Sequence, residues 1–256
     1  MGKKQKNVPI NKTFYQDYDK FYISTYKPIS KPILWNYITN KNNEKIHKLF
    51  LKYKKYIRGR CLEIGCAPAK YLIYFKRVFD CDVFGIDNSY EGTLVSKKNL
   101  KVSKVNGNII MASCLNLPFR EETFDVIVSF GLIEHFTDPK LLLSYFYKIL
   151  KPNGILITYV PNMVIGLRYF YELLFDKQNL DGHQKISKKF LYKAYKELNF
   201  KNIYAIYSGI WIWVYLPLLR RFFRYNMGEN YIPDFLLNRF FITRFNSKEV
   251  ICIGIK

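Results

Sequence analysis

The chain has 256 residues, enough to bury one sizeable α/β core with one or two additions. Its five cysteines are odd in number and none forms a C-x-x-C pair, which excludes a disulfide framework. With no apolar leader, we expect reduced thiols and a cytoplasmic location. The formal net charge is +21, divided as +11 in residues 1–58, +2 in 59–160 and +8 in 161–256. The excess positive charge therefore flanks a nearly neutral middle.

Residues 1–57 are predicted to form a basic cap before the first strand. Within this cap, Asn43 to Ile57 repeats apolar residues at helical spacing with lysines on the other face, which predicts a helix packed on the domain. The positive charge favours an anionic partner such as anionic lipid or nucleic acid. A lysine-rich composition with no such partner is the alternative.

A strand–turn–helix–strand unit follows the cap. Its predicted parts are a strand at Cys61–Ile64, a small-residue turn at Gly65–Ala69, a helix at Lys70–Phe79 and a strand at Asp82–Ile86. Asp87 ends the second strand. Such a unit is typical of α/β folds that bind an adenosine-containing cofactor, because the backbone of a small-residue turn approaches the ligand closely and the acid accepts hydrogen bonds from the ribose hydroxyls. A dinucleotide is disfavoured, since Lys70 stands where the third glycine of its fingerprint is needed.

Strands and helices continue to alternate up to Val160, which implies a mainly parallel sheet with helices on both faces. The predicted parts are strands at Ile109–Met111, Phe124–Phe130 and Ile155–Val160, a helix at Asp138–Leu150 and a turn at Lys151–Gly154. Glu134 and His135 follow the central strand. They are interpreted either as part of a ligand site or as a solvated loop pair.

In this order and spacing the motifs resemble those of the class I S-adenosylmethionine-dependent methyltransferases, of the type 11/23 kind. The run from Glu63 to Ala69 resembles their E/D-x-G-x-G-x-G motif, and the later L-P-F and K-P-N-G steps match as well. The resemblance implies S-adenosylmethionine as cofactor and a Rossmann-like α/β fold. Its seven-stranded sheet is expected to be mainly parallel with an antiparallel edge hairpin. The cofactor-binding residues that it implies are Glu63, Gly65, Cys66, Ala67, Asp87, Asn88, Ser113, Cys114, Leu115 and Phe130.

Two positions depart from the family pattern. Ala69 adds a methyl group where the family has glycine close to the cofactor, and Ser113 stands where an Asp often binds the adenine amine. These departures keep a non-catalytic S-adenosylmethionine-binding protein open as an alternative.

The last third of the chain holds two apolar segments. Met163–Phe175 predicts a helix, and Asn202–Tyr207 and Glu249–Ile255 predict the edge hairpin. The core is thus expected to span residues 58–207 and 248–256, with 208–247 as an insertion. The apolar run 210–219 of this insertion is shorter than the ~20 residues needed to cross a bilayer. Three arginines follow it, so the insertion is interpreted as a lid over the substrate or a segment in the lipid headgroup region.

Methyl transfer to a hydroxyl requires removal of its proton, a task suited to histidine. The chain has three histidines, of which His47 lies in the cap helix and is expected to be structural. His135 follows the fourth strand, at the sheet edge where such folds bind ligands, and is the first catalytic candidate. His183 is the second. The alternative is that positioning alone suffices and neither is catalytic. No metal site is expected.

The function inferred from the sequence is O-methylation of a small-molecule, glycan or lipid-linked acceptor, with an anionic membrane surface as a further partner. The protein is then expected in the cytoplasm, at the membrane periphery where the insertion contacts lipid. An RNA methyltransferase is the main alternative. It is disfavoured because Ser129 to Leu132 lacks the N/D-P-P-Y/F step of base-amine methylases.

Overall fold

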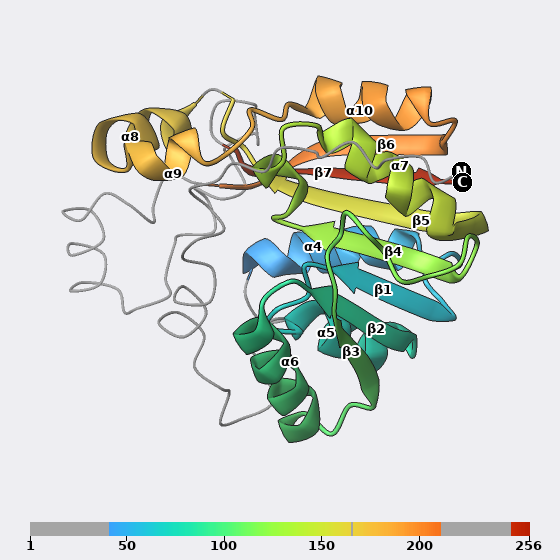
Figure 1. The fold of residues 1–256 in the computed structure, drawn as a ribbon. Coiled ribbons are helices and arrows are strands. Elements are labelled where there is room, and N and C mark those ends of the chain that lie inside the picture. Colours follow the sequence, from blue (N-terminus) through green and yellow to red (C-terminus); the bar gives the residue numbers. More distant parts are fainter. Residues whose placement is uncertain (1–40, 165, 211–246) are drawn as a thin grey trace, which may run out of the picture.

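The computed structural model describes residues 41–164, 166–210 and 247–256. The strands of this part form one sheet in the order β3-β2-β1-β4-β5-β7-β6. In that order they span Gly107–Met111, Asp82–Asp87, Arg60–Ile64, Phe124–Phe130, Leu150–Pro161, Ser247–Ile255 and Lys201–Ile210. Strands β3, β2, β1, β4 and β5 pair in parallel, whereas β7 runs antiparallel to both of its neighbours (Figure 1). The predicted fold class is confirmed.

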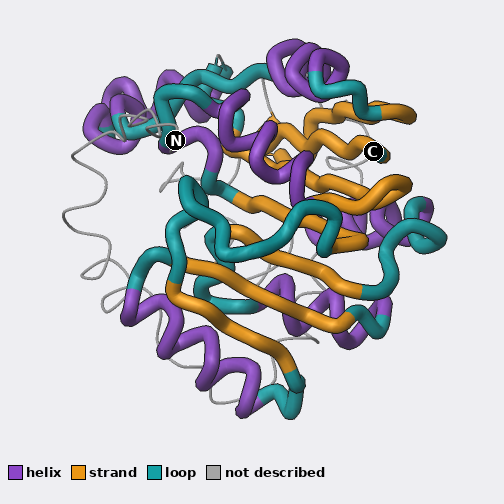
Figure 2. The backbone as a smooth tube through the Cα atoms, turned by 45° about the vertical axis from the view of Figure 1, so that its right-hand side comes forward, coloured by secondary structure: helices purple, strands orange, loops and turns teal. Residues whose placement is uncertain are grey.

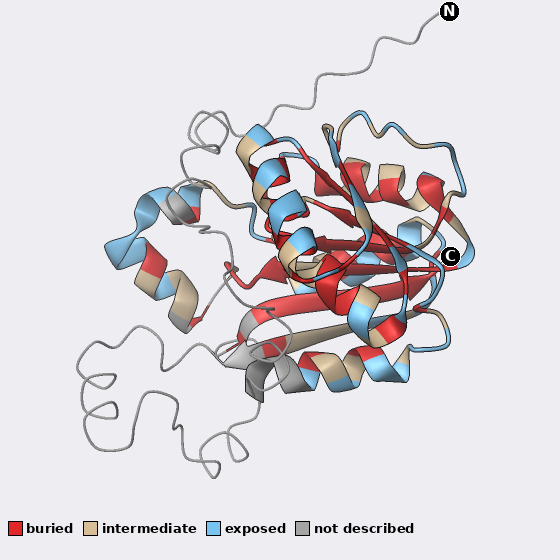
Figure 3. Ribbon diagram, turned by 90° about the horizontal axis from the view of Figure 1, so that it is seen from below, coloured by how far each residue is buried: buried red, intermediate tan, exposed pale blue. Residues whose placement is uncertain are grey.

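Helices cover both faces of this sheet. They span Lys41–Lys52 (α4), Lys70–Phe79 (α5), Tyr90–Val102 (α6), Pro139–Ile149 (α7), Leu167–Phe175 (α8), Lys177–Asp181 (α9) and Lys188–Glu197 (α10), with a short 3₁₀ helix η1 at Ile133–His135. Helices α4, α5 and α6 contribute to the apolar cluster on one face, and α7 and α10 to the cluster on the other. Figure 2 shows helices on both sides of the strands. The central strands are therefore buried between two helical layers, whereas the edge strands β3 and β6 are largely exposed or half-buried, and the helices expose their outer sides (Figure 3).

Polar side chains mark the starts of three of these helices. The side chains of Ser89, Asp138 and Ser187 each accept a hydrogen bond from the backbone N–H three residues later, at the starts of α6, α7 and α10. Each such cap satisfies a donor that has no partner within its helix and contributes about 1 kcal/mol. The turns into these helices are therefore specified locally.

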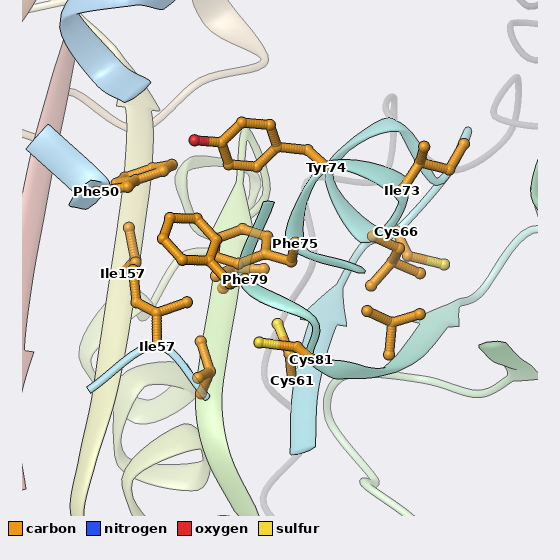
Figure 4. Packing of buried hydrophobic residues seen from close by; sticks show 14 of the residues in the cluster. Phe50, Ile57, Cys61, Cys66, Ile73, Tyr74, Phe75, Phe79, Cys81 and Ile157 are labelled. Carbon is orange, nitrogen blue, oxygen red and sulfur yellow. The ribbon is translucent and has the colours of Figure 1, made fainter. Parts of the chain in front are cut away.

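Aromatic rings join α4 to α5 on one face of the sheet. The ring of Phe50 lies 5.7 Å from that of Phe75, and the ring of Tyr74 meets Phe79 edge-on at 5.9 Å (Figure 4). The side chains of Cys61 and Cys81 lie close together in the same cluster. All five cysteines are buried free thiols, so this core is held by apolar packing.

Three predicted boundaries are wrong by several residues. Helix α4 ends at Lys52 instead of Ile57, and α8 begins at Leu167 instead of Met163. Strand β5 begins at Leu150 instead of Ile155, so the predicted K-P-N-G turn lies within an irregular strand. Leu150 pairs with Phe124 across a register shift. The last residue of the chain also forms backbone hydrogen bonds with the K-P-N-G stretch. Such long-range pairing leaves no local sequence signal.

The described residues include only part of the predicted cap and insertion. Residues 1–40 of the cap and 211–246 of the insertion lie outside them. Strands β6 and β7 extend past the predicted core limits, to Ile210 and from Ser247 respectively. Within the described part of the chain, no helix combines the length and apolar character needed to cross a membrane.

Candidate active site

The small-residue turn after β1 is fastened to the end of β2. The N–H groups of Gly65 and Cys66 both donate to the carbonyl of Ile86, at 2.9 and 3.0 Å. Gly65 has a φ of 75°, and a Cβ there would lie 3.3 Å from Leu132 of the loop after β4. Glycine is therefore required here by the left-handed backbone and by the contact with that loop.

Asp87 ends β2 and holds the same turn. Its Oδ2 accepts the N–H of Ala67 at 3.1 Å, and its Oδ1 accepts the N–H of Ser89 at 3.0 Å. A carboxylate oxygen has two lone pairs, so an oxygen that accepts one N–H can in general also accept a ligand hydroxyl. Asn88 is exposed beside it. The acid is thus fixed in place before any ligand binds.

Glu63 lies two residues before Gly65 and is buried in β1. Burial raises the pKa of its carboxyl group well above the usual value, while Lys70 and the backbone N–H of Leu72 oppose the shift. Its Oε2 has no hydrogen-bond partner among the described residues. Glu63 is therefore a buried acid in β1, next to the turn that begins at Gly65.

The segment after β3 lies next to Asp87, since the N–H of Ala112 donates to the Asp87 carbonyl at 3.0 Å. Ser113 Oγ accepts the N–H of Leu115 at 3.2 Å, and its own hydroxyl proton is available to a ligand. Cys114 is buried, and burial raises the pKa of its thiol to about 12. The predicted adenine side of the site is therefore a short polar turn with a protonated thiol.

Phe130 ends β4 with its ring packed inward. Its centroid lies 4.0 Å from that of Tyr71 on α5 and 5.7 Å from that of Tyr159 on β5. Gly131 follows with a φ of 69°, and its N–H donates to the Tyr159 carbonyl at 2.8 Å. The backbone therefore turns sharply just past β4, beside the turn that carries Gly65.

The ten predicted cofactor residues gather at one edge of the sheet. They lie at or just past the carboxyl ends of β1, β2, β3 and β4, which the strand order makes neighbours. The order of the strands reverses between β1 and β4, and ligands of open α/β sheets bind at such a switch point. The fold thus brings the predicted set together in the expected place.

Glu134, His135 and His183 form a second group at this edge. The rings of His135 and His183 lie 4.5 Å apart between centroids, and His135 Nε2 lies 4.0 Å from Glu134 Oε1. One ligand atom from each of the three lies within 4.8 Å of the others. Glu134 is 1% exposed and His135 is 6% exposed, so the interpretation as a solvated loop pair is wrong.

Burial shifts the pKa values of Glu134 and His135 away from their usual values. It lowers the pKa of His135 to about 3, with a further contribution from nearby His183, and it raises the pKa of Glu134 to about 8. His135 is therefore a neutral imidazole at physiological pH, and its ring nitrogen Nδ1 lies 3.4 Å from the carbonyl of Gly182. A weakly basic imidazole orients a hydrogen-bonding partner better than it removes a proton.

Comparison with known proteins identifies this fold. Residues 62–158 match the family described as "Methyltransferase domain". These residues are a class I S-adenosylmethionine-dependent methyltransferase domain. The matched family and a solved neighbour with bound S-adenosyl-L-methionine support S-adenosylmethionine as its cofactor.

Relatives of the methyltransferase differ in their named substrates. Phosphoethanolamine N-methyltransferase 3 of Arabidopsis thaliana is 35% identical over 100 residues, which are 39% of this chain and 20% of that protein. Probable tRNA methyltransferase 9B of Homo sapiens is 32% identical over 112 residues, which are 42% of this chain and 22% of that protein. The chain thus spans about a fifth of the length of these two relatives.

A solved structure shares the fold of the methyltransferase. Phosphoethanolamine N-methyltransferase 2 of Haemonchus contortus, in complex with S-adenosyl-L-methionine, superposes with a TM-score of 0.59 at 17% identity. The match covers 93% of this chain and 59% of that one.

The residues at the sheet edge fit the cofactor. Asp87 offers two carboxylate oxygens to the ribose hydroxyls, and the Gly65 turn places backbone beside them. Among the described residues, a Cβ at Gly131 would have only Glu134 Oε1 within 4 Å, at 3.6 Å, so this part of the chain leaves room beside Glu134. The roles of the individual residues stay predictions.

Sequence reasoning missed three residues that shape the site. Asn99 of α6 donates to the carbonyl of Pro68 at 2.9 Å and so supports the cofactor turn, and Tyr71 stacks on Phe130. Neither has a sequence signal. Glu134 was noted beside His135 but not included among the site residues, although its position next to a candidate histidine was a signal. His47, by contrast, bonds to the Tyr74 hydroxyl at 2.8 Å in the cap helix, away from this group.

Proposed function

We propose that this methyltransferase transfers the methyl group of S-adenosylmethionine to a hydroxyl of a small-molecule, glycan or lipid-linked acceptor. The observation that carries the proposal is the group of buried Glu134, buried His135 and half-buried His183 near the predicted cofactor turn. The loop after β4 links the two, since a Cβ at Gly65 would lie 3.3 Å from Leu132 of that loop. A polar group buried in this place supports a role in handling a polar acceptor atom.

The cofactor and the two histidines have separate tasks in this proposal. The cofactor, when bound, supplies a methyl group already activated by its sulfonium. His135 and, second to it, His183 orient the acceptor hydroxyl in line with that methyl group. The new O–CH₃ bond forms as the S–CH₃ bond breaks, and the hydroxyl proton leaves to water. The neutral state of His135 supports orientation, because a neutral imidazole has one N–H donor and one acceptor nitrogen.

The apolar outer side of α8 supports an acceptor with a lipid or other apolar part. Leu174 and Phe175 are each 73% exposed, and Phe170 is 46% exposed. Helices α8 and α9 extend beyond the sheet end at which β5 terminates (Figure 1). This surface therefore adjoins the proposed acceptor side, and contact with an anionic membrane surface is part of the proposal.

RNA is the second candidate acceptor. Two observations favour it, namely the similarity to a probable tRNA methyltransferase and the net charge of +21. The lack of a base-amine methylase motif at residues 129–132 counts against it. An N-methylated small molecule, as named for the Arabidopsis relative, is a further outcome of the test.

The test is a tritium-transfer assay with three acceptor pools: polar lipids, soluble glycans and small molecules, and bulk tRNA. Labelled products are isolated and the methylated atom is identified by mass spectrometry. We expect an O-methyl product from one of the first two pools, lost in His135→Ala and retained in the matched control His47→Gln. Label found only in tRNA, or only on nitrogen, would overturn the hydroxyl assignment.

A further inference from the structure

We propose that Glu134, His135 and His183 bind a zinc ion. They contribute one carboxylate and two imidazoles, the ligand set of many catalytic zinc sites, in which a fourth position stays open. The three residues come from η1 and from the turn after α9, and the fold alone brings them together. The sequence shows no metal-ligand spacing that would have revealed them.

The distances suit an ion after small side-chain movements. Zinc binds nitrogen and oxygen at about 2.0–2.2 Å, so neighbouring ligand atoms around it lie roughly 3–3.5 Å apart. His135 Nε2 and Glu134 Oε1 are 4.0 Å apart, and all three ligand atoms lie within 4.8 Å. Closing this gap by about 1 Å requires only rotation about side-chain torsions.

The carboxylate provides a second, independent observation. Glu134 Oε2 is buried and has no hydrogen-bond partner among the described residues. A buried polar atom without a partner is costly and points to a missing ligand such as an ion. Arg168 is the positive group that influences Glu134, and its Nε lies 3.5 Å from Glu172 Oε1. Arg168 lowers the pKa of Glu134 and so favours the carboxylate form that would bind an ion, while burial opposes it.

The surroundings hold the ligands as metal sites require. His135 Nδ1 lies 3.4 Å from the Gly182 carbonyl, and an N–H donated there would fix the tautomer and the orientation of the ring. The N–H of Gln184 donates to the Glu134 carbonyl at 2.6 Å, which fixes the His183 turn to η1. Among the described residues, a Cβ at Gly131 would have only Glu134 Oε1 within 4 Å, at 3.6 Å, so the described part of the chain leaves room there for a fourth ligand.

The ligand types favour zinc over other ions. Magnesium and calcium prefer oxygen ligands alone, whereas imidazole suits zinc, and methyl transfer needs no electron from the metal. Zinc binding stands by itself. Its role rests on the proposed function: with the ion bound, the two histidines would orient the acceptor hydroxyl through the ion and not by direct contact, and the ion would lower the pKa of that hydroxyl.

The test uses the full chain, freed of metal with a chelator. Cobalt(II), which replaces zinc and absorbs visible light, is titrated in and then displaced with zinc. We expect one equivalent bound with the spectrum of nitrogen and oxygen ligands, and zinc is expected to raise the melting temperature. A strong thiolate-to-cobalt band would place the metal on cysteine and overturn the site. Failure to bind either ion would overturn it as well.

Two conservative variants localise the ion. Glu134→Gln and His183→Gln should weaken zinc binding by about 10–100-fold or more and abolish the shift in melting temperature. His47→Gln is the matched control and should bind like the wild type. Equal affinity in His183→Gln would overturn the site, and circular dichroism of each variant shows whether it folds.

The outcomes separate this proposal from the proposed function. S-adenosylmethionine affinity is measured by calorimetry on the metal-free protein. Cofactor binding and O-methylation without any zinc binding would overturn the zinc site and leave the proposed function in place. Zinc binding together with methylation of RNA alone would overturn the proposed function and leave the zinc site in place.

Discussion

The carboxylate of Asp87 accepts the backbone N–H of Ala67 at 3.1 Å, so the acid at the end of β2 directly holds the turn after β1. The same carboxylate accepts the N–H of Ser89 at the start of α6. One side chain thus joins the turn, the strand and the next helix. A change at Asp87 is expected to affect cofactor affinity through both its ligand contacts and this turn.

Asp87→Ala should weaken S-adenosylmethionine binding by about 2–4 kcal/mol, because two charge-assisted contacts to the ribose are lost. Isothermal titration calorimetry measures the effect. Asp125→Asn is the control, since Asp125 accepts the N–H of Arg60 and the Lys151 ammonium at the start of β1 and β5. Unchanged affinity in Asp87→Ala would contradict its assignment to the cofactor.

Gly65→Ala should destabilise the fold by about 1–3 kcal/mol, since a side chain at a φ of 75° is strained. The added Cβ would also lie 3.3 Å from Leu132 Cδ1, so the loop after β4 must shift. Urea denaturation gives the change in the free energy of unfolding. A neutral effect would mean that the turn adopts another backbone conformation.

Ala69→Gly should leave S-adenosylmethionine affinity equal or slightly higher. The sequence predicted a methyl group crowding the cofactor, but Ala69 is fully buried in the apolar cluster that includes α4 and α5. Its φ of 68° favours glycine, while loss of a buried methyl costs about 0.8 kcal/mol, so stability should change by less than about 1 kcal/mol. Calorimetry and urea denaturation are paired on this variant, and loss of binding would show that the motif is aligned incorrectly.

The native thiols should resist Ellman's reagent. All five cysteines are buried, and a pKa of about 12 leaves the Cys114 thiol protonated at pH 8, with roughly one thiolate in 10⁴. Less than one thiol is expected to react in minutes, against five after unfolding in urea. Rapid reaction of one native thiol would show that the fold opens near that residue.

Anionic vesicles should bind the protein in a salt-sensitive way. Arg220, Arg221 and Arg224 follow the apolar run of the insertion, outside the described residues, and each is expected to contribute about 1 kcal/mol near an anionic surface. Vesicle co-sedimentation of the triple Ser variant measures this. The variant should lose binding and keep its cofactor affinity, whereas equal sedimentation would exclude these arginines as the contact.

The sequence by itself determined the class of fold, and it predicted the cofactor and the edge of the sheet for the cofactor site. Strand and helix periods, the small-residue turn at Gly65 and the acid at Asp87 are local features, and each carries its signal within a few residues.

Only the tertiary structure decided which distant residues share the site. The start of β5 at Leu150 depends on pairing with Phe124 and with the chain end, and the stacking of Tyr71 on Phe130 joins a helix to a strand. The group of Glu134, His135 and His183 arises because the turn after α9 folds back onto η1. Contacts between segments far apart in the chain depend on packing, and they cannot be predicted from the spacing of residues along the sequence.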